Sequence, residues 1–287
     1  MIAANFEYES PSELQEALAL ISSRPEAKPL AGGHSLLPAM KLRLASPGLL
    51  VDLGRIRGLD YIRQVGERIH IGAMTTHAEI AGSSLLRAAS PLLLQAASEI
   101  GDVQVRNRGT IGGSLAHADP AADYPAAILA LDAEIVAMST RGERQIRARD
   151  FFTGLFTTAL QPDELITEVR IPVTTPAGTS YKKFAHPASG FAVVGVAAVV
   201  RTKGSNIESA AIGVTGVAPS AYRAIAVEQA LKGQPASAIS NAVEHAADGI
   251  EAMGDYFASA EYRSHLAKVF TRRALEEAEA ASRSRRK

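Results

Sequence analysis

Leu30-Ala31-Gly32-Gly33-His34-Ser35-Leu36-Leu37 places two adjacent glycines directly after a short strand-like run. Successive backbone NH groups of adjacent glycines can point into one concavity, which suits a phosphate or a pyrophosphate. A second pair lies in Thr110-Ile111-Gly112-Gly113-Ser114, again beside hydroxyl residues. One such pair alone is more often a tight turn. Two pairs favour a ligand with two phosphates.

The common nucleotide-binding fingerprints are missing. No G-x-G and no G-K-[ST] occur in the chain, so neither a Rossmann fold nor a P-loop is indicated. Gly33-His34-Ser35-Leu36-Leu37 comes within one residue of the G-x-S-x-G elbow of α/β-hydrolases. Because Leu37 replaces the last glycine and no HGGG-type oxyanion loop is present, a hydrolase is disfavoured.

Composition excludes several classes of function. The formal charge is zero, with 30 basic and 30 acidic residues, which argues against nucleic-acid binding. The chain has no cysteine, which excludes disulfides, thiolate catalysis and cysteine-ligated metal centres within it. The seven histidines show neither H-x3-H nor H-E-x-x-H spacing. We therefore predict no metal site and no catalytic residue in this chain.

Hydropathy and the positions of turn-forming residues predict where the protein lies in the cell and how the chain divides into sub-domains. No apolar run approaches the ~20 residues of a membrane span, and the amino terminus lacks a signal-peptide pattern, so we expect a cytoplasmic protein. Ser10-Pro11-Ser12-Glu13 predicts a capped helix over 11–22. A Pro/Thr/Gly-rich linker at 172–178 precedes three strand-like runs. The predicted sub-domains are residues 1–57, 58–176 and 177–287.

The sequence around both glycine pairs resembles a known family. Leu30 to Leu44 closely resembles the first FAD-binding segment of the carbon monoxide dehydrogenase medium-subunit family, which includes the FAD-binding subunits of xanthine dehydrogenases. Arg106 to Pro120 resembles the T-I-G-G-N segment of that family. Weaker likenesses at 51–53, 71–76 and 165–172 extend the resemblance over essentially the whole chain.

This resemblance implies a fold and a division of labour. The implied fold is an α+β, PCMH-type (vanillyl-alcohol-oxidase-like) FAD-binding fold, with a C-terminal sub-domain of a three-stranded antiparallel sheet plus helices. The chain would hold FAD and pass electrons to a terminal acceptor, which is oxygen, NAD or a quinone. A large molybdenum-pterin subunit would oxidise the substrate, and a small subunit would carry 2Fe-2S clusters, in a dimer of heterotrimers.

The resemblance also assigns cofactor-binding residues. Both glycine segments should wrap the pyrophosphate and the adjoining sugar oxygens of FAD. The segment residues are Ala31, Gly32, Gly33, His34, Ser35, Leu36, Thr110, Ile111, Gly112, Gly113 and Ser114. Ser114 departs from the asparagine that many members have, which puts its contact with the cofactor in doubt.

The resemblance also assigns roles to single residues outside the two glycine segments. Asp123 matches a carboxylate near the flavin, and it can at the same time cap the helix from Tyr124. Ile100 and Ile166 match apolar residues that line the flavin site, although core packing explains them equally well. Lys183, in preference to Lys182, matches a lysine beside the flavin, and Phe191 would cover one flavin face. Gly190 stands where the family often has aspartate.

Two alternatives remain open. The chain could be a stand-alone FAD-dependent oxidoreductase of the same fold. It could also be a non-catalytic scaffold that has lost FAD, because Ser114 and Gly190 depart from the common pattern. The substrate of the complex cannot be derived from this chain, since the large subunit would select it.

Overall fold

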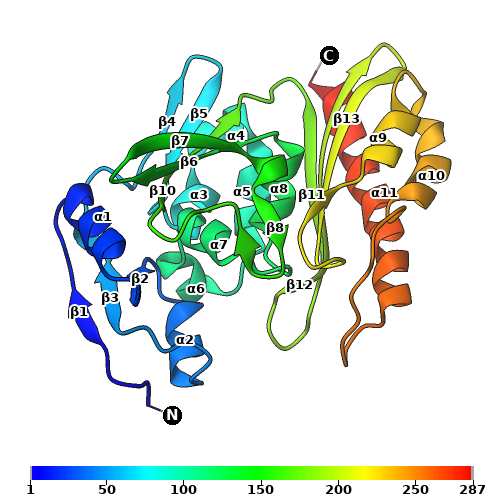
Figure 1. Ribbon diagram of the computed structural model, residues 1–287. Helices are drawn as coiled ribbons and strands as arrows, with labels where there is room; N and C mark the ends of the chain where they lie inside the picture. The colour runs from blue at the N-terminus through cyan, green and yellow to red at the C-terminus, as the bar shows by residue number, and fades with distance from the viewer. Residues whose placement is uncertain (1, 286–287) are drawn as a thin grey trace.

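The computed structural model describes residues 2–285. Its amino-terminal unit, shown in blue in Figure 1, is a parallel three-stranded sheet with strand order β1-β3-β2. Its elements are β1 (Glu7–Glu9), α1 (Leu14–Ser23), β2 (Ala27–Leu30), α2 (Leu36–Lys41), β3 (Leu49–Asp52) and η1 (Leu53–Arg55). Helix α1 buries Ala17, Leu18 and Ile21 against β3, as the i, i+3, i+4 pattern requires.

The start of α1 corrects one expectation. The predicted helix over 11–22 with a capping box at Ser10–Glu13 is wrong at its amino-terminal end, because the helix begins at Leu14. Glu13 occupies the N-cap position with extended backbone and makes no capping hydrogen bond through its side chain. The fully formed capping box lies instead at Thr76 and Glu79, where each side chain accepts from the other residue's backbone NH.

The middle unit is an antiparallel five-stranded sheet, order β4-β5-β10-β6-β7, with helices beneath it (Figure 1). The sheet strands are β4 (Ile62–Val65), β5 (Arg68–Gly72), β6 (Glu134–Ser139), β7 (Gly142–Arg147) and β10 (Leu165–Pro172). The helices are α3 (His77–Gly82), α4 (Ser84–Ala89), α5 (Pro91–Ser98), α6 (Val103–Arg108), α7 (Ile111–His117), α8 (Tyr124–Ala130) and η2 (Ala148–Asp150). A two-stranded ribbon, β8 (Phe152–Gly154) with β9 (Thr157–Thr158), completes the unit.

The C-terminal unit is an antiparallel sheet with α11 along one face (Figure 1). Its strands are β11 (Gly178–Ala185), β12 (Ala192–Lys203), β13 (Asn206–Thr215) and β14 (Tyr222–Arg223). The helices are α9 (Ile225–Leu231), η3 (Ala236–Ala238), α10 (Ile239–Ala242), η4 (Val243–His245) and α11 (Ala260–Ser284). The three long strands match the expected three-stranded sheet, and β14 adds a fourth strand of two residues.

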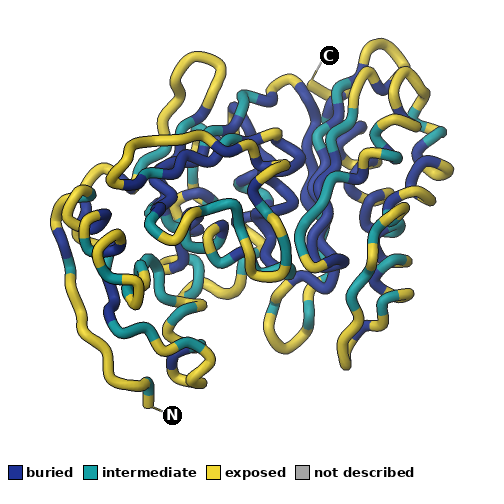
Figure 2. The backbone as a smooth tube through the Cα atoms, viewed as in Figure 1, coloured by how far each residue is buried: buried dark blue, intermediate teal, exposed yellow. Residues whose placement is uncertain are grey.

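Burial shows how the units join. The buried part of the tube in Figure 2 runs through the helices of the middle unit and into the long strands of the C-terminal sheet. Tyr181 of β11 and Ala197 of β12 belong to the core of the middle unit, so the two units share one core.

The predicted sub-domain boundaries 57/58 and 176/177 stay predictions, and residues 1 and 286–287 of the predicted sub-domains lie outside the described residues. Over residues 2–285, no helix has the length and apolar character needed to cross a membrane.

Two glycines allow helices to approach the C-terminal sheet on opposite sides. A Cβ built at Gly178 would lie 1.8 Å from the Ala278 carbonyl oxygen of α11. A Cβ at Gly213 would lie 2.0 Å from the Ala126 carbonyl oxygen of α8. The helices therefore rest on the strand backbone itself. The packing of both units on the sheet depends on the missing side chains.

Replacing Gly178 by alanine should destabilise the protein, because helix α11 must move away from β11 to admit the methyl group. The expected loss is about 1–3 kcal/mol, the usual cost of overpacking. Gly82→Ala is the matched control, since nothing lies within 4 Å of its added Cβ and it ends helix α3. The control should be neutral or slightly stabilising. Equal urea midpoints for the two variants would contradict this account.

Candidate cofactor-binding site

The first glycine loop connects β2 to α2 and leaves a row of backbone donors free. Gly33 has φ +78, the left-handed region that favours glycine. The Leu37 NH donates to the Gly33 carbonyl at 3.0 Å, which closes the turn into α2. Within residues 2–285, the NH groups of 32–36 donate to no other atom of the chain. Five successive donors are therefore available to an anion at this turn.

The second glycine loop is different, because its donors are used inside the protein. The Ile111 NH donates to the Thr75 carbonyl at 3.1 Å, and the Gly112 NH donates to the Ala73 carbonyl at 2.8 Å. The Gly113 NH donates to Thr110 Oγ1 at 3.2 Å as the N-cap of α7. These hydrogen bonds hold the second loop against the segment 73–75, which follows β5. We expected both loops to bind the pyrophosphate; the NH groups of 111–113 are bonded within the described part of the protein, whereas those of 32–36 are not.

The two loops meet directly. A Cβ built at Gly32 would lie 2.2 Å from the Arg108 carbonyl oxygen and 2.8 Å from Gly109 Cα, so only glycine permits this approach of two backbones. A Cβ at Gly113 would lie 3.4 Å from Ala31 Cβ. Figure 1 accordingly shows α2 beside the end of α6. The two predicted binding segments, far apart in sequence, therefore lie against one another.

His77 supports the second loop from below. Its NH donates to the Gly109 carbonyl at 2.9 Å, and its ring fills the space where a Gly109 side chain would stand. Its Nδ1 lies 3.1 Å from the hydroxyl of the fully buried Tyr124. Burial, followed by the nearby His34 and Arg106, lowers the pKa of His77 to about 4. The imidazole is therefore neutral at physiological pH.

Asp123 and Lys183, assigned separately from the sequence, form one buried ion pair. Lys183 Nζ lies 3.0 Å from Asp123 Oδ1 and donates to the Glu99 carbonyl at 2.8 Å. The Tyr181 hydroxyl donates to Asp123 Oδ1 at 2.5 Å. Burial raises the pKa of Asp123 to about 6, against the opposing effect of Lys183. Asp123 stands at the N-cap position of α8 without a capping hydrogen bond from its side chain, so the expected capping role is wrong.

The alternation of β11 separates the two candidate lysines. Lys183 points to the middle unit, and its side chain is only 2% exposed. Lys182 points to the other face and pairs with Glu277 of α11. Tyr181 shares the inward face with Lys183, and this two-residue period was the signal in the sequence that could have identified it. Lys183 is therefore buried between the two units, whereas Lys182 lies on the face covered by α11.

The remaining predicted residues lie at two places. Ile100 follows α5, and its carbonyl accepts from Arg106 at 2.9 Å. Phe191 lies in the loop before β12 and is 46% exposed. A Cβ at Gly190 would lie 4.0 Å from Gly101 Cα, so this loop adjoins the Ile100 segment. Ile166 is buried in β10 within the core of the middle unit, where packing accounts for it.

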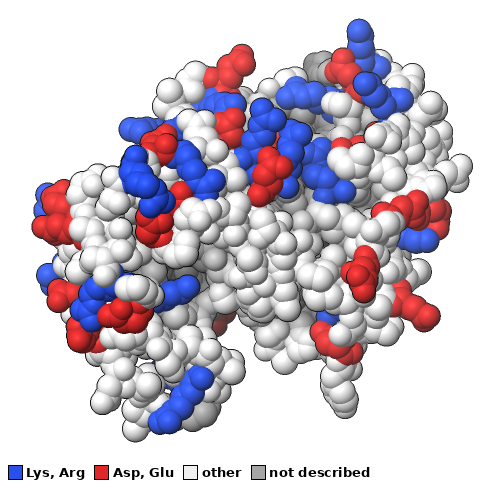
Figure 3. Space-filling model, in the orientation of Figure 1, with Lys and Arg blue, Asp and Glu red and all other residues white. Residues whose placement is uncertain are grey.

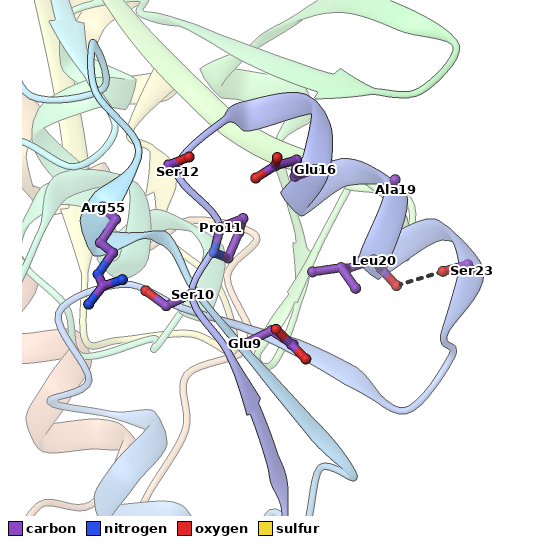
Figure 4. Close-up of a pocket in the computed structure, with 9 residues that line it drawn as sticks. All are labelled: Glu9, Ser10, Pro11, Ser12, Glu16, Ala19, Leu20, Ser23 and Arg55. Atoms are coloured by element: carbon purple, nitrogen blue, oxygen red, sulfur yellow. Dashed lines mark hydrogen bonds between the residues drawn. The ribbon is translucent and has the colours of Figure 1, made fainter.

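Other surface hollows lie away from the loops. One of about 690 Å³ lies between β1 and α1 and is lined by Glu9, Ser10, Pro11, Ser12, Glu16, Ala19, Leu20, Ser23 and Arg55 (Figure 4). Another of about 450 Å³ adjoins the start of α11. Neither is lined by a residue of the glycine loops. Within the described part of the chain, no group of three His, Cys, Asp or Glu residues is placed to hold a metal ion.

Residues 4–174 match the family described as FAD binding domain in molybdopterin dehydrogenase, and residues 179–278 match the CO dehydrogenase flavoprotein C-terminal domain. The chain belongs to this FAD-binding family of molybdopterin dehydrogenases. The resemblance, the fold class and the FAD cofactor predicted from the sequence are confirmed.

Individual relatives match along their full lengths. The chain is 40% identical over 281 residues to the carbon monoxide dehydrogenase medium chain of Hydrogenophaga pseudoflava, covering 96% of this chain and 97% of the relative. It is 36% identical over 279 residues to the glyceraldehyde dehydrogenase medium chain of Sulfolobus acidocaldarius, covering 96% and 99%. A structure of the Hydrogenophaga pseudoflava enzyme lacking the Mo-pyranopterin moiety matches with TM-score 0.95 and 41% identity over 98% of this chain and 99% of the other.

The pKa of His77 predicts acid sensitivity of this site. The pKa of His77 in the folded protein is about 4, below the ordinary value of 6.5. The folded state therefore loses free energy of unfolding as the pH falls from 6.5 toward 4, because the histidine of the unfolded chain takes up a proton first. At pH 5 the loss is about 2 kcal/mol. His77→Asn should flatten this part of the stability curve, measured by denaturant unfolding between pH 7 and 5. An unchanged slope in the variant would show that His77 is not the group responsible.

Proposed function

We propose that this chain is the electron-transferring FAD subunit of a molybdenum hydroxylase and that the first glycine loop binds the pyrophosphate of FAD. The row of free NH groups at 32–36 carries this proposal, because such a row suits two linked phosphates. The second loop, pressed against it at Gly32 and Arg108, supplies the opposite wall. Thr110 and Ser114 bring hydroxyl groups to that wall for the adjoining sugar oxygens.

The residues present fit the cofactor. Gly32 and Gly33 keep the loop free of side chains, and any Cβ at Gly32 would break its contact with the second loop. The buried Lys183–Asp123 pair lies beside the Glu99 carbonyl, to which Lys183 donates. When bound, FAD supplies the redox chemistry that no side chain here can provide. The chain's own residues hold the cofactor, orient it and carry fixed charge near it.

The subunit role is favoured over a stand-alone enzyme. Relatives that match over nearly their whole length are named medium chains. We propose partners of two kinds, a large molybdenum-pterin subunit and a small 2Fe-2S subunit, in a cytoplasmic dimer of heterotrimers. Electrons would pass from the iron-sulfur clusters through FAD to oxygen, NAD or a quinone.

A surface beside the first loop supports docking of the iron-sulfur partner. Leu42 and Leu44 are 51% and 80% exposed directly after α2, and Arg43 between them has the strained φ of +60. Figure 3 shows cationic side chains over this end of α2 without acidic neighbours, whereas acidic and basic residues are interspersed over the middle sheet. A partner surface with apolar contacts and acidic residues fits here, next to the proposed cofactor site.

The glycine conformation gives a controlled test of the FAD site. Gly33→Ala should lower FAD affinity in the assembled complex about tenfold to a hundredfold, because the strained turn misaligns charge-assisted hydrogen bonds. Gly58→Ala is the control, since Gly58 has the similar φ of +81, has nothing within 4 Å and lies outside both loops. FAD released per chain and titrated back by fluorescence measures the affinity. Equal affinities for the two variants would refute the assigned loop.

The same complex tests the subunit role. Leu42→Asp with Leu44→Asp should reduce recovery of the iron-sulfur subunit at least tenfold in a pull-down of co-expressed subunits, while the variant chain keeps its circular dichroism. Val65→Asp, on an exposed apolar residue of the β4–β5 hairpin, is the control. Full recovery of the iron-sulfur subunit by the double variant would show that this surface does not bind it.

Two further measurements separate the alternatives. Substrate turnover by the chain alone would favour a stand-alone oxidoreductase, and a complex without FAD would favour a scaffold.

A further inference from the structure

The loop between β11 and β12, which carries Phe191, is held by a histidine that the sequence did not single out. His186 Nδ1 accepts two backbone hydrogen bonds, from Ala188 NH at 3.2 Å and from Ser189 NH at 3.3 Å. This is the arrangement by which an Asn or Asp side chain closes a turn over the following residues. The imidazole can play this part only when Nδ1 carries no proton.

The backbone of the loop closes on the same residue. The His186 NH donates to the Phe191 carbonyl at 2.8 Å, and the Gly190 NH donates to the His186 carbonyl at 2.8 Å. Gly190 has φ +72, so the chain reverses at a left-handed position immediately before Phe191. The Phe191 NH also donates to Ser189 Oγ at 3.4 Å, so the direction in which Phe191 leaves the turn is set by hydrogen bonds to His186 and Ser189.

The ring of His186 is itself fixed by the C-terminal unit. It packs on Phe257 with ring centroids 4.4 Å apart. The NH of Phe257 donates to Asp255 Oδ1 at 2.9 Å, and Asp255 pairs with Arg263 of α11. Arg263 in turn donates to the Val193 and Gly216 carbonyls of the sheet at 2.7 Å each. The support of the loop thus continues into the core of the C-terminal unit.

We propose that His186 is a positioning residue that holds Phe191 over the flavin by accepting two backbone hydrogen bonds through Nδ1 while its ring rests on Phe257. The inference rests on the proposed FAD site and adds to it the element that sets its aromatic cover. The loop adjoins Gly101 through Gly190, and Gly101 follows Ile100 and the Glu99 carbonyl that accepts from Lys183, so the loop lies beside the other predicted flavin contacts.

Two substitutions separate the acceptor from the ring. His186→Asn keeps an acceptor near the position of Nδ1 and loses the ring that packs on Phe257. His186→Phe keeps a ring against Phe257 and loses the acceptor. In the assembled complex, hydrogen exchange of the peptide containing Ala188 and Ser189 should accelerate about fivefold to tenfold in the Phe variant, the factor expected from a lost hydrogen bond. The Asn variant should stay close to the original rate. Unchanged exchange in the Phe variant would overturn the assignment of Nδ1.

A second measurement links the loop to the flavin. Iodide quenching of flavin fluorescence in the complex should rise in His186→Phe to the level of Phe191→Ala, and His186→Asn should restore the original value. Faster exchange without a change in quenching would mean that the loop does not cover the flavin, which would overturn the inference. In that case stoichiometric FAD would leave the proposed function intact. Loss of FAD from Gly33→Ala is the separate test of that function.

Discussion

The buried ion pair between Asp123 and Lys183 is the constraint on which the arrangement of the units depends. It joins the start of α8 in the middle unit to β11 in the C-terminal unit, and Tyr181 and the Glu99 carbonyl complete its hydrogen bonds. Taking either charge away leaves the other buried without a partner, which typically costs several kcal/mol. The close approach of α8 to Gly213 lies on the same interface. The C-terminal sheet is therefore held in one position relative to the middle unit and its second glycine loop.

The two glycine loops have similar sequences and different tasks. The NH groups of the first loop are free among the described residues, and few contacts hold that loop. The NH groups of the second loop donate to the carbonyls of Ala73 and Thr75 and to the hydroxyl of Thr110. A loop with free donors needs a rigid neighbour if it is to keep its shape before a ligand arrives. The contact at Gly32 provides that neighbour, with His77 packed beneath it. Preorganisation of this kind lowers the cost of ordering the site on binding.

The resemblance of the two glycine segments to a known family implied the class of fold, which is confirmed, whereas the residues assigned to the cofactor stay predictions. Adjacent glycines, strand alternation and the proline-rich linker are visible without a structure. What failed depended on contacts between distant residues. The pattern at Ser10–Glu13 did not start a helix there, and Thr76–Glu79 formed the capping box instead. The use of the second loop's donors is set by the segment 73–75, and the roles of His77 and His186 depend on Gly109 and Phe257.

The contact between Gly32 and Arg108 also has a consequence for synthesis of the chain. The first loop leaves the ribosome well before its wall exists, and Lys183 and Phe191 follow later still. On the proposed site, no early fragment presents all of the segments that would contact the cofactor. A ligand that binds only the finished arrangement stabilises that arrangement by mass action. Binding of FAD at the proposed site would therefore distinguish a fully folded chain from one whose folding is incomplete.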